Sequence, residues 1–454
     1  MAGSNPSDDQ AATIAFLSRP DSYGITGPVE RIDTHAAIVF LAGERAYKLK
    51  RAVRYSFLDF SPLARRRAVC EAELTLNRRT APELYLELRS VNRQADGTVG
   101  FGAGEVLDWV IVMQRFGGGD LLEAVAARGD LHAGLVRELA DAIAAFHDRA
   151  EVVACTDGAG RVRRVIDGNA ATMAGLPDDR LPRQDCEDLH DRSSALWQQL
   201  APLLDARGTG GHVRHCHGDL HLANICLWRG RPVPFDCLEF DVELATIDVL
   251  YDLAFLVMDL CERGYRGQAS LLFNRYLDMR DEAAGIAALP LFLSMRAAIR
   301  AHVGATAAGM QASGAGRREK LAAAREYLAA ARAFLAAEPA RLVAIGGFSG
   351  TGKSTLAAAL APEIGPAPGA RWLRTDVLRK RMAGVAPEMR LPSASYSREH
   401  GKAVYRRLAG QARAMLAAGR SVVVDGVFAD PQERQEIAAV AAEAGVRFDG
   451  LWLQ

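Results

Sequence analysis

The sequence predicts an α+β domain followed by an α/β domain with a parallel sheet, and three observations support this. Residues 28–55 read as strands and helical patterns dominate from residue 120 onward, an order typical of α+β domains. Residues 341–345 form a short apolar strand that runs straight into a glycine-rich turn and a helix. Residues 421–426 read as a further buried strand, parallel to that one. The length of 454 residues corresponds to roughly three modules at about 150 residues each.

The composition indicates a chain with balanced charge. Lys+Arg and Asp+Glu both number 55, so the net charge gives no indication of a nucleic acid or an acidic membrane as partner. Seven cysteines are scattered without a CxxC pair, as is typical of reduced thiols. The first ten residues lack the basic and apolar segments of a signal peptide, and no run of about 18 apolar residues occurs. We therefore expect a soluble cytoplasmic protein without nucleic-acid or membrane partners.

The first strands carry two lysines. Residues 11–17 are expected to form a short helix, 36–41 an apolar strand and 46–50 an alternating strand. Lys48 and Lys50 lie on the same face of this last strand, because side chains alternate with a period of two. One interpretation is a solvated edge strand that carries basic residues.

Helices dominate the chain after these strands. Residues 62–79 read as a helix that carries Glu71 and Glu73, with Ser61 as a possible N-cap and Pro62 at its first position. Residues 109–113 read as a buried strand, and 114–119 as a flexible connector. Helical patterns continue over 120–149, in two polar helices between 150 and 210, over 247–260, and in an alanine-rich segment over 317–337. Residues 338–340 end that segment and mark a domain boundary.

One stretch, residues 215–241, carries groups suited to phosphoryl transfer. Asp219 is followed five places later by Asn224, and Asp236 stands at the end of the apolar hairpin that comes next. Phosphoryl transfer needs a carboxylate that orients and deprotonates the attacking hydroxyl, and oxygen ligands that hold Mg²⁺ across the phosphates. The spacing predicts Asp219 as the base and Asn224 and Asp236 as metal ligands. The alternative is a zinc site, since this region also contains His212, His215, Cys216, His217 and His221, but their spacing does not match a four-ligand pattern.

This stretch resembles the catalytic segment of the aminoglycoside phosphotransferase family, small-molecule kinases with a protein-kinase-like fold. His217, Gly218 and Asp219 stand where protein kinases have His-Arg-Asp, and residues 248–254 resemble the family's Asp-x-x-x-Asp-Leu-Ala helix start. The resemblance covers roughly residues 20–335. It implies a kinase-like domain over 1–338, with a small nucleotide lobe over about 20–115 and a large lobe over about 116–338.

The resemblance also implies where ATP is contacted. Lys48 or Lys50, with a small preference for Lys50, would contact the phosphates, and Glu71 or Glu73 would be the acidic partner of that lysine. The backbone near Met113 would contact adenine, and Asp252 would act structurally. No G-x-G-x-x-G loop precedes the lysine strand, so the loop that covers the phosphates is not identified.

The glycine-rich turn predicts a second nucleotide site. From Gly347 the sequence matches G-x-x-x-x-G-K-[ST], with a strand before it and a helix after it. The glycines let successive backbone N–H groups point at phosphate oxygens, Lys353 would reach the β/γ-phosphates, and Ser354 would ligate Mg²⁺. The predicted ATP-binding residues here are Gly347, Ser349, Gly350, Thr351, Gly352, Lys353, Ser354 and Thr355.

The rest of this module, residues 341–454, resembles P-loop kinases of small molecules and nucleotides. Residues 372–381 resemble their second strand and following helix, which implies acceptor contacts from Asp376 and Arg379; ordinary helix-start and surface roles are the alternative. Asp425 ends a buried strand and is predicted to hold Mg²⁺ through water or to position the hydroxyl. Residues 446–454 read as the next strand. The arginine-bearing lid of such kinases does not follow, so we expect a C-terminally incomplete module.

The two halves together resemble bacterial fusions described as bifunctional aminoglycoside phosphotransferase/ATP-binding proteins. The sequence thus predicts a phosphotransferase that uses ATP and Mg²⁺ to phosphorylate a hydroxyl of a small molecule. A protein kinase would use the same Asp219, Asn224 and Asp236, but no recognisable activation loop is present after them. A nucleotide-sensing regulatory protein, in which the P-loop module controls the first domain, is the other alternative.

Overall fold

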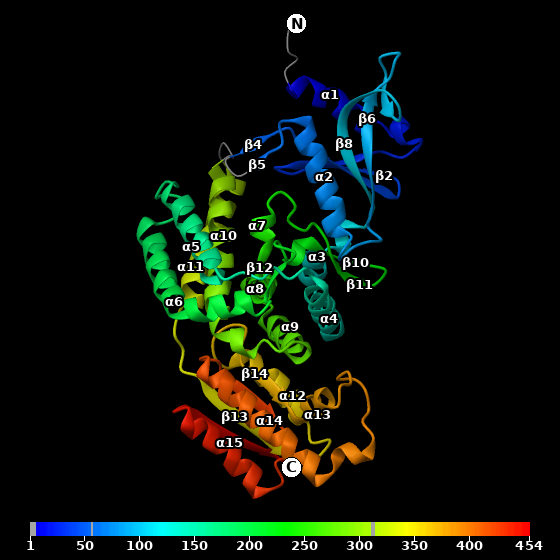
Figure 1. The fold of residues 1–454 in the computed structure, drawn as a ribbon. Helices are drawn as coiled ribbons and strands as arrows, with labels where there is room; N and C mark the ends of the chain where they lie inside the picture. Colours follow the sequence, from blue (N-terminus) through cyan, green and yellow to red (C-terminus); the bar gives the residue numbers. More distant parts are fainter. Residues whose placement is uncertain (1–5, 56–57, 310–313) are drawn as a thin grey trace. The chain divides into compact units, whose positions relative to one another are not determined.

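The computed structural model describes residues 6–55, 58–309 and 314–454, and Figure 1 shows its fold. Residues 1–5 belong to the segment in which we expect no signal peptide, and they lie outside the described residues. The chain forms two compact units. One consists of Met1–Leu131 with His217–Thr246, and the other of His132–Cys216 with Ile247–Gln454. From His217 onward, the predicted catalytic stretch therefore shares a unit with the lysine strand, whereas the P-loop module shares a unit with helices that precede it in the chain.

The first unit is built on an antiparallel sheet with the strand order β1-β2-β3-β8-β6-β7. These strands are β1 (Glu30–Asp33), β2 (Ala37–Ala42), β3 (Arg45–Lys50), β6 (Tyr85–Arg93), β7 (Val99–Phe101) and β8 (Glu105–Gln114). Because β3 pairs with both β2 and β8, the lysine strand is an interior strand. The solvated-edge interpretation of Lys48 and Lys50 is therefore wrong.

Two helices cover opposite faces of this sheet. Val110 and Val112 point to a core shared with α1 (Pro6–Leu17), and Ile111 and Met113 point to a core shared with α2 (Leu63–Asn77). This division follows the two-residue alternation of β8. The predicted start of α2 is wrong by one residue, because Pro62 has extended backbone angles and is the N-cap, so the helix begins at Leu63.

The catalytic stretch closes the first unit with short elements. These are η3 (Leu222–Asn224), the antiparallel hairpin β10 (Ile225–Trp228) and β11 (Arg231–Pro234), and α7 (Val242–Ala245). Upstream of it, α3 (Leu122–Ala127) and α4 (Ala133–Arg149) replace the single helix predicted over 120–149. Gly129, with a φ of +84°, turns the chain between them, a conformation that glycine adopts without strain.

The second unit contains a helical half. Its helices are α4, α5 (Gly158–Ala174), α6 (Arg183–Thr209), α8 (Val249–Glu262), α9 (Arg266–Met279), α10 (Leu289–Gly309) and α11 (Ala315–Phe334). Helix α8 is buried along almost its whole length and packs against α9 and α10. One described segment, Ala283–Gly309, is long and apolar enough to cross a membrane, but 67% of its most apolar window is buried inside the molecule. The core helices of globular proteins have the same property.

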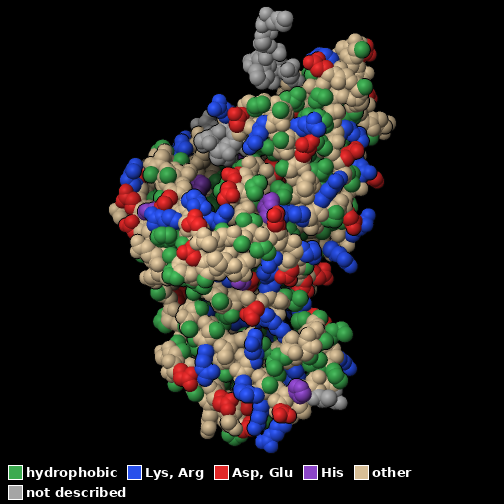
Figure 2. Space-filling view, viewed as in Figure 1, with side chains coloured by type: hydrophobic (Ala, Val, Ile, Leu, Met, Phe, Trp, Pro, Cys, Tyr) green, Lys and Arg blue, Asp and Glu red, His purple; other side chains and the backbone are tan. Residues whose placement is uncertain are grey.

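The P-loop module of the second unit has the predicted parallel sheet, with the strand order β14-β15-β13-β16. Its elements are β13 (Arg341–Gly347), α12 (Lys353–Leu360), β14 (Arg371–Arg374), α13 (Thr375–Met382), α14 (Arg398–Ala417), β15 (Val422–Asp425), α15 (Pro431–Glu443) and β16 (Arg447–Leu453). Since parallel strands end at the same edge of a sheet, the P-loop after β13 and Asp425 at the end of β15 lie together. On the face shown in Figure 2, acidic and basic side chains are interspersed, in keeping with the balanced charge.

Candidate active sites

The two lysines of β3 meet one buried carboxylate. Lys48 Nζ lies 2.7 Å from Glu73 Oε1, and Lys50 Nζ lies 2.5 Å from Glu73 Oε2. The Glu73 side chain is fully buried on the face of α2 that packs against the sheet. Glu71 lies on the opposite face of this helix, where it is half exposed and pairs with Arg67 at 2.9 Å. The prediction of Glu71 as a partner of the strand lysines is therefore wrong, and Glu73 takes that position.

Each lysine has a second carboxylate from the catalytic stretch. Asp236 Oδ1 lies 2.5 Å from Lys48 Nζ, and Glu239 Oε1 lies 2.5 Å from Lys50 Nζ. The sequence analysis did not identify Glu239. Its position three residues after Asp236 carries no recognised signal, because only the fold brings it against Lys50.

The backbone at Asp236 is held in an unusual conformation. Asp236 has a φ of +61°, a left-handed conformation that costs of order 1–3 kcal/mol for a residue other than glycine. Two side chains from the sheet and from α2 hold this turn: the Tyr85 hydroxyl accepts from the Asp236 N–H at 3.3 Å, and Asn77 Oδ1 accepts from the Cys237 N–H at 2.8 Å. The turn directs the Asp236 carboxylate toward Lys48.

The ion pair between Lys48 and Asp236 favours the charged forms of both groups, of which Lys48 is largely buried and Asp236 is 37% exposed. Burial alone would lower the pKa of Lys48, but Asp236 and Glu73 outweigh it and hold that pKa well above its usual value. Burial alone would raise the pKa of Asp236, yet Lys48 and Lys50 hold it below the usual value. Asp219 acts in the opposite direction on Asp236, since a nearby like charge favours the protonated form. The Lys48 ammonium and the Asp236 carboxylate thus face each other in their ionised forms.

Asp219 and Asn224 are in direct contact. The Asn224 amide nitrogen donates to the Asp219 backbone carbonyl at 3.0 Å and to Asp219 Oδ2 at 2.8 Å. Asn224 is buried, whereas 40% of the Asp219 side chain is exposed and can be reached from solvent. A backbone hydrogen bond from the Phe235 N–H to the Asn224 carbonyl, 2.9 Å long, ties this turn to the residue before Asp236. The three predicted residues are thus gathered in one region of the first unit.

Gly218 allows this turn to close. Its φ is +83°, and a Cβ atom added to it would lie 3.0 Å from Leu238 Cβ. His217 fixes the same turn from the other side, since its Nε2 lies 3.0 Å from the Phe235 carbonyl oxygen. A larger residue at position 218 would be strained and would displace the segment that carries Asp236.

Oxygen atoms suited to a divalent cation remain available here. The Asn224 amide nitrogen faces Asp219, so the Asn224 Oδ1 is the atom left for a metal. The Oδ2 of Asp236 also forms no hydrogen bond with a described residue. An amide oxygen and a carboxylate oxygen are hard ligands of the kind that Mg²⁺ prefers. The residues therefore fit the predicted ion.

Two further expectations concern the strands around the lysines. Met113 lies within the sheet, paired with Ala46 on one side and Tyr85 on the other, just before the connector that was predicted to contact adenine. That contact stays a prediction. The turn of residues 34–36 joins β1 to β2 beside Lys50, where the Arg51 N–H donates to the Ala36 carbonyl at 2.8 Å. The loop that covers the phosphates, which the sequence analysis did not identify, stays unassigned.

The predicted zinc alternative finds no support in the described part of the chain. His212 Nδ1 lies 3.1 Å from Glu282, and the group whose ligand atoms lie within 4.8 Å of one another consists of His147, Cys216 and Asp252. In that group both ring nitrogens of His147 are engaged, Nε2 with Asp252 at 3.0 Å and Nδ1 with the Tyr276 hydroxyl at 2.8 Å. A completely buried and hydrogen-bonded network of this kind stabilises a core, and the structural role expected of Asp252 agrees with it.

The P-loop has the backbone that its glycines predict. Gly347, Gly350 and Gly352 have φ values of +145°, +85° and +85°. A Cβ atom on Gly347 would lie 2.5 Å from the Leu453 carbonyl oxygen, so the loop tolerates no side chain there. Lys353 begins α12, and its Nζ donates to the Phe348 carbonyl of the same loop at 2.5 Å.

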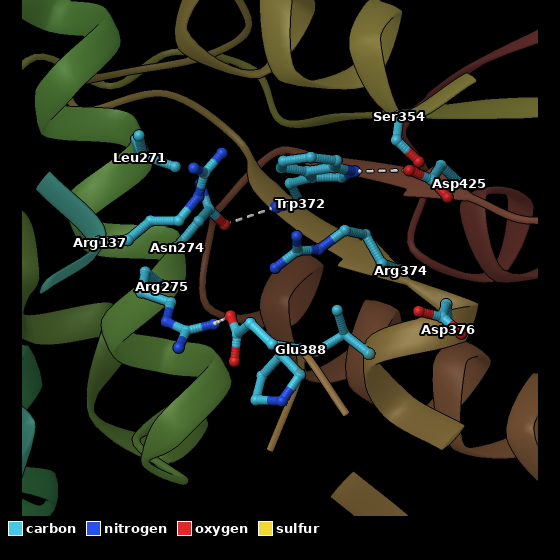
Figure 3. Close-up of a pocket in the computed structure, with 12 residues that line it drawn as sticks. Arg137, Leu271, Asn274, Arg275, Ser354, Trp372, Arg374, Asp376, Glu388 and Asp425 are labelled. Carbon is cyan, nitrogen blue, oxygen red and sulfur yellow. Dashed lines mark hydrogen bonds and ion pairs between the residues drawn. The ribbon is translucent and has the colours of Figure 1, made fainter. Parts of the chain in front are cut away.

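Asp425 and Ser354 form the adjoining pair. Asp425 is buried and accepts from the Trp372 indole N–H at 3.1 Å, and the Ser354 side chain lies beside its carboxylate (Figure 3). Burial raises the pKa of the Asp425 carboxyl above its usual value, and the hydrogen bonds from Ser354 and Trp372 partly offset this. A hydroxyl beside a carboxylate at the end of a parallel strand is a donor set that fits Mg²⁺.

Of the two predicted acceptor residues, Asp376 lines a cavity beside the P-loop and Arg379 does not. Asp376 lines a cavity next to Ser354 and Asp425, with its carboxylate 2.8 Å from Lys380. Arg379 does not line this cavity; its guanidinium packs on the ring of Tyr396 at 4.8 Å. Within residues 341–454, the arginine that lines the cavity is Arg374, five residues earlier, which the sequence analysis did not select.

Two family models match the chain. One, described as the phosphotransferase enzyme family, matches residues 60–286, which is half of the chain. The chain belongs to the phosphotransferase enzyme family. The other model, described as an AAA domain, matches residues 342–454. This phosphotransferase therefore combines a protein-kinase-like domain with a nucleotide-binding P-loop domain on a parallel sheet, as the sequence predicted.

Relatives of this phosphotransferase share both parts of the chain. An uncharacterized protein of Mycobacterium tuberculosis (strain H37Rv) is 31% identical over 419 residues, which cover 90% of this chain and 80% of that protein. A protein of Mycobacterium bovis matches to the same extent. Among solved structures, a choline/ethanolamine kinase family protein from Mesorhizobium loti has a TM-score of 0.43 at 17% identity, covering 72% of this chain and 99% of its own. An ethanolamine kinase of Plasmodium vivax has a TM-score of 0.43 at 11% identity, covering 72% and 89%.

Proposed function

We propose that the first unit transfers the γ-phosphoryl group of ATP to a hydroxyl of a small molecule, and that the P-loop domain binds a second ATP. The observation that carries this is the grouping of Lys48, Glu73, Asp236, Asn224 and Asp219. It supplies a cation for the phosphates, oxygen ligands for a metal and an accessible base, and phosphoryl transfer needs little else from a protein.

Each residue takes a separate part in the proposed reaction. Asp219, exposed and oriented by Asn224, accepts the proton of the attacking hydroxyl. Asn224 and Asp236 hold Mg²⁺, which when bound neutralises charge on the phosphates. Lys48 contacts the phosphates and is kept in place by Glu73.

The geometry favours Lys48 over Lys50 as the lysine that contacts ATP. Only 3% of the Lys50 side chain is exposed, and its ammonium group lies between two carboxylates, Glu73 and Glu239. Lys48 lies beside Asp236, the proposed metal ligand, where phosphate oxygens would be. We therefore assign Lys50 to the support of Glu73 and of the segment after Asp236.

The P-loop domain binds ATP by a separate set of groups in this proposal. The backbone between Gly347 and Thr355, including Ser349, Gly350, Thr351 and Gly352, surrounds the phosphates. Lys353 leaves the Phe348 carbonyl and reaches the β/γ-phosphates. Ser354 ligates Mg²⁺, and Asp425 holds the ion through water or positions a hydroxyl.

The test is ADP formation by the full chain with a panel of sugars, amino alcohols and nucleosides as acceptors. We expect Asp219→Asn to lower acceptor-dependent turnover by about 100- to 10,000-fold, the usual contribution of a positioned base, with ATP still bound. Asp191→Asn, at an exposed position, is the matched control. Lys353→Ala should leave this turnover intact. Full activity of Asp219→Asn would contradict the proposal, and loss of activity in Lys353→Ala would assign the reaction to the P-loop domain.

A further inference from the structure

A cavity of about 190 Å³ lies next to the P-loop, inside the second unit (Figure 3). It opens at the carboxyl ends of β14 and β15, where Ser354 and Asp425 are found. Apolar atoms of Leu271, Val377 and Pro387 contribute to its wall. Pockets for drug-sized ligands have volumes of about 300 Å³ and more, so this cavity suits a compound of triose or small hydroxy-acid size.

Helices outside the P-loop domain complete this cavity. Arg137 belongs to α4, and Asn274 and Arg275 belong to α9. Both helices lie within the part of the chain that matches the phosphotransferase family, whereas β14 and the P-loop lie in the AAA domain. The cavity is therefore composite, and the P-loop domain alone would present it without one wall.

The contact that forms this wall is buried and hydrogen-bonded. Strand β14 is at the edge of the parallel sheet, and Asn274 of α9 pairs with that edge: its Oδ1 accepts from the Trp372 N–H at 2.7 Å and its Nδ2 donates to the Ala370 carbonyl at 3.1 Å. Arg371, almost fully buried, donates to the Asn274 carbonyl at 3.0 Å and to Asp278 at 2.7 Å. Buried polar groups that satisfy one another in this way fix the geometry between their elements.

The carboxylates around the cavity are already engaged. Glu388 pairs with Arg275 at 2.7 Å, and Asp425 is hydrogen-bonded to Trp372 and Ser354. Arg275 is in turn held by both oxygens of Asp141, at 2.6 and 2.7 Å. Arg275 is thus shared by two carboxylates, and Asp425 is held by uncharged donors, so each of these carboxylates is ion-paired or hydrogen-bonded.

Two arginines retain free donors. Arg137 forms no hydrogen bond or ion pair with any described residue. Arg374 lies over the Trp372 ring at 4.3 Å and pairs with Asp278, but its buried Nε has no partner among the described residues. Figure 3 shows Arg137, from α4, and Arg374, from β14, among the side chains that line the cavity. Guanidinium groups that line a cavity suit a phosphate or a carboxylate group.

We propose that this composite cavity binds a small hydroxyl compound with an anionic group, as the phosphoryl acceptor of the P-loop domain. Arg137 and Arg374 contact the anion, and this rests on the proposed binding of ATP at the P-loop. In transfer, the acceptor oxygen bonds to the γ-phosphorus while the bond from that phosphorus to the β,γ-bridging oxygen breaks. ADP leaves with the electron pair, and the hydroxyl proton passes to Asp376, the carboxylate of the lining that is paired only with a neighbouring lysine among the described residues.

The experiment is calorimetric titration of the full chain, saturated with AMP-PNP and Mg²⁺, with three probes. Glycerol 3-phosphate carries a phosphate, glycerate a carboxylate, and glycerol no charge. We expect one of the two anions to bind and glycerol not to bind, and the anion that binds identifies the group. Arg137→Gln should weaken this binding by about 10- to 100-fold, as expected for the loss of a charge-assisted hydrogen bond. Arg318→Gln, an exposed helix arginine without partners among the described residues, is the control and should bind as the unmodified chain does.

A second variant guards against an indirect effect of Arg137→Gln. Leu271→Phe adds volume to the wall and should also weaken binding, without a change of charge. Failure of both anions to bind, or equal binding by Arg137→Gln and the control, would overturn the inference. The number of AMP-PNP molecules bound per chain tests the proposed function separately. If the P-loop binds no nucleotide, the unmodified chain and the Lys353→Ala variant would each bind one AMP-PNP. The cavity would then lose its role in transfer even if a probe bound.

Discussion

Glu73 provides a direct test of the lysine cluster. Its carboxylate is completely buried and contacts Lys48 at 2.7 Å and Lys50 at 2.5 Å. The change Glu73→Gln keeps the size of the side chain and removes its charge. Each lysine would retain one carboxylate, Asp236 for Lys48 and Glu239 for Lys50, so neither ammonium group would be left without an acidic partner.

The free-energy cost of Glu73→Gln depends on the burial of this ion pair. Removal of one partner from a buried ion pair costs about 3–5 kcal/mol, and the remaining carboxylates place Glu73→Gln near the lower value. For a folding unit of 150–250 residues, about 1 kcal/mol lowers the melting temperature by roughly 2–4 °C. The transition of the first unit should therefore shift down by on the order of 10 °C.

The matched control is Glu71→Gln, two residues away on the same helix. Glu71 is half exposed and pairs only with Arg67 among the described residues, so its loss should change the free energy of unfolding by less than about 0.5 kcal/mol. Both variants are measured by differential scanning calorimetry. AMP-PNP affinity at the first site is measured in a Lys353→Ala background, and it should fall in Glu73→Gln alone because Lys48 loses its support.

Equal melting temperatures for the two glutamate variants would refute this reasoning. So would a loss of nucleotide affinity confined to Glu71→Gln, because the phosphate-contacting lysine would then depend on the exposed face of α2.

Two further predictions concern the P-loop and the helical half of the second unit. Gly347→Ala should weaken AMP-PNP binding at the P-loop at least about tenfold, since its Cβ would lie 2.5 Å from the Leu453 carbonyl oxygen; Gly410→Ala, with open space inside α14, should bind normally and be slightly more stable. Burial lowers the pKa of His302 from 6.5 to about 4. Between these two pH values the unfolded chain is protonated at His302 while the folded chain is not, so the stability of the fold decreases as the pH falls from 6.5 to 4. The free energy of unfolding should drop by roughly 3 kcal/mol between pH 7 and 4, measured by urea denaturation, and His302→Gln should flatten that dependence; an unchanged pH profile would contradict it.

Much of the fold could be predicted from local patterns. The two-residue alternation of residues 46–50 and the apolar run of residues 109–113 predicted strands. The strand, loop and helix around Gly347 and Lys353 predicted the P-loop with its positive φ angles. The single helix expected over 120–149 was wrong, because periodicity continues across Gly129 even though the backbone turns there.

The residues of the candidate sites likewise fall into two groups: those that the local sequence predicted and those that only packing decided. Asp219 and Asn224 are five residues apart, so one turn of chain brings them into contact and the sequence alone determined that pair. Glu73 rather than Glu71, and Lys48 beside Asp236, were decided by the packing of α2 on the sheet and by a contact between residues 188 positions apart. The wall that α9 adds to the P-loop cavity had no signal in the sequence at all. Residues near each other in the chain constrain one another through backbone geometry, whereas distant side chains meet only after whole elements have packed, and that packing depends on every surface they bury.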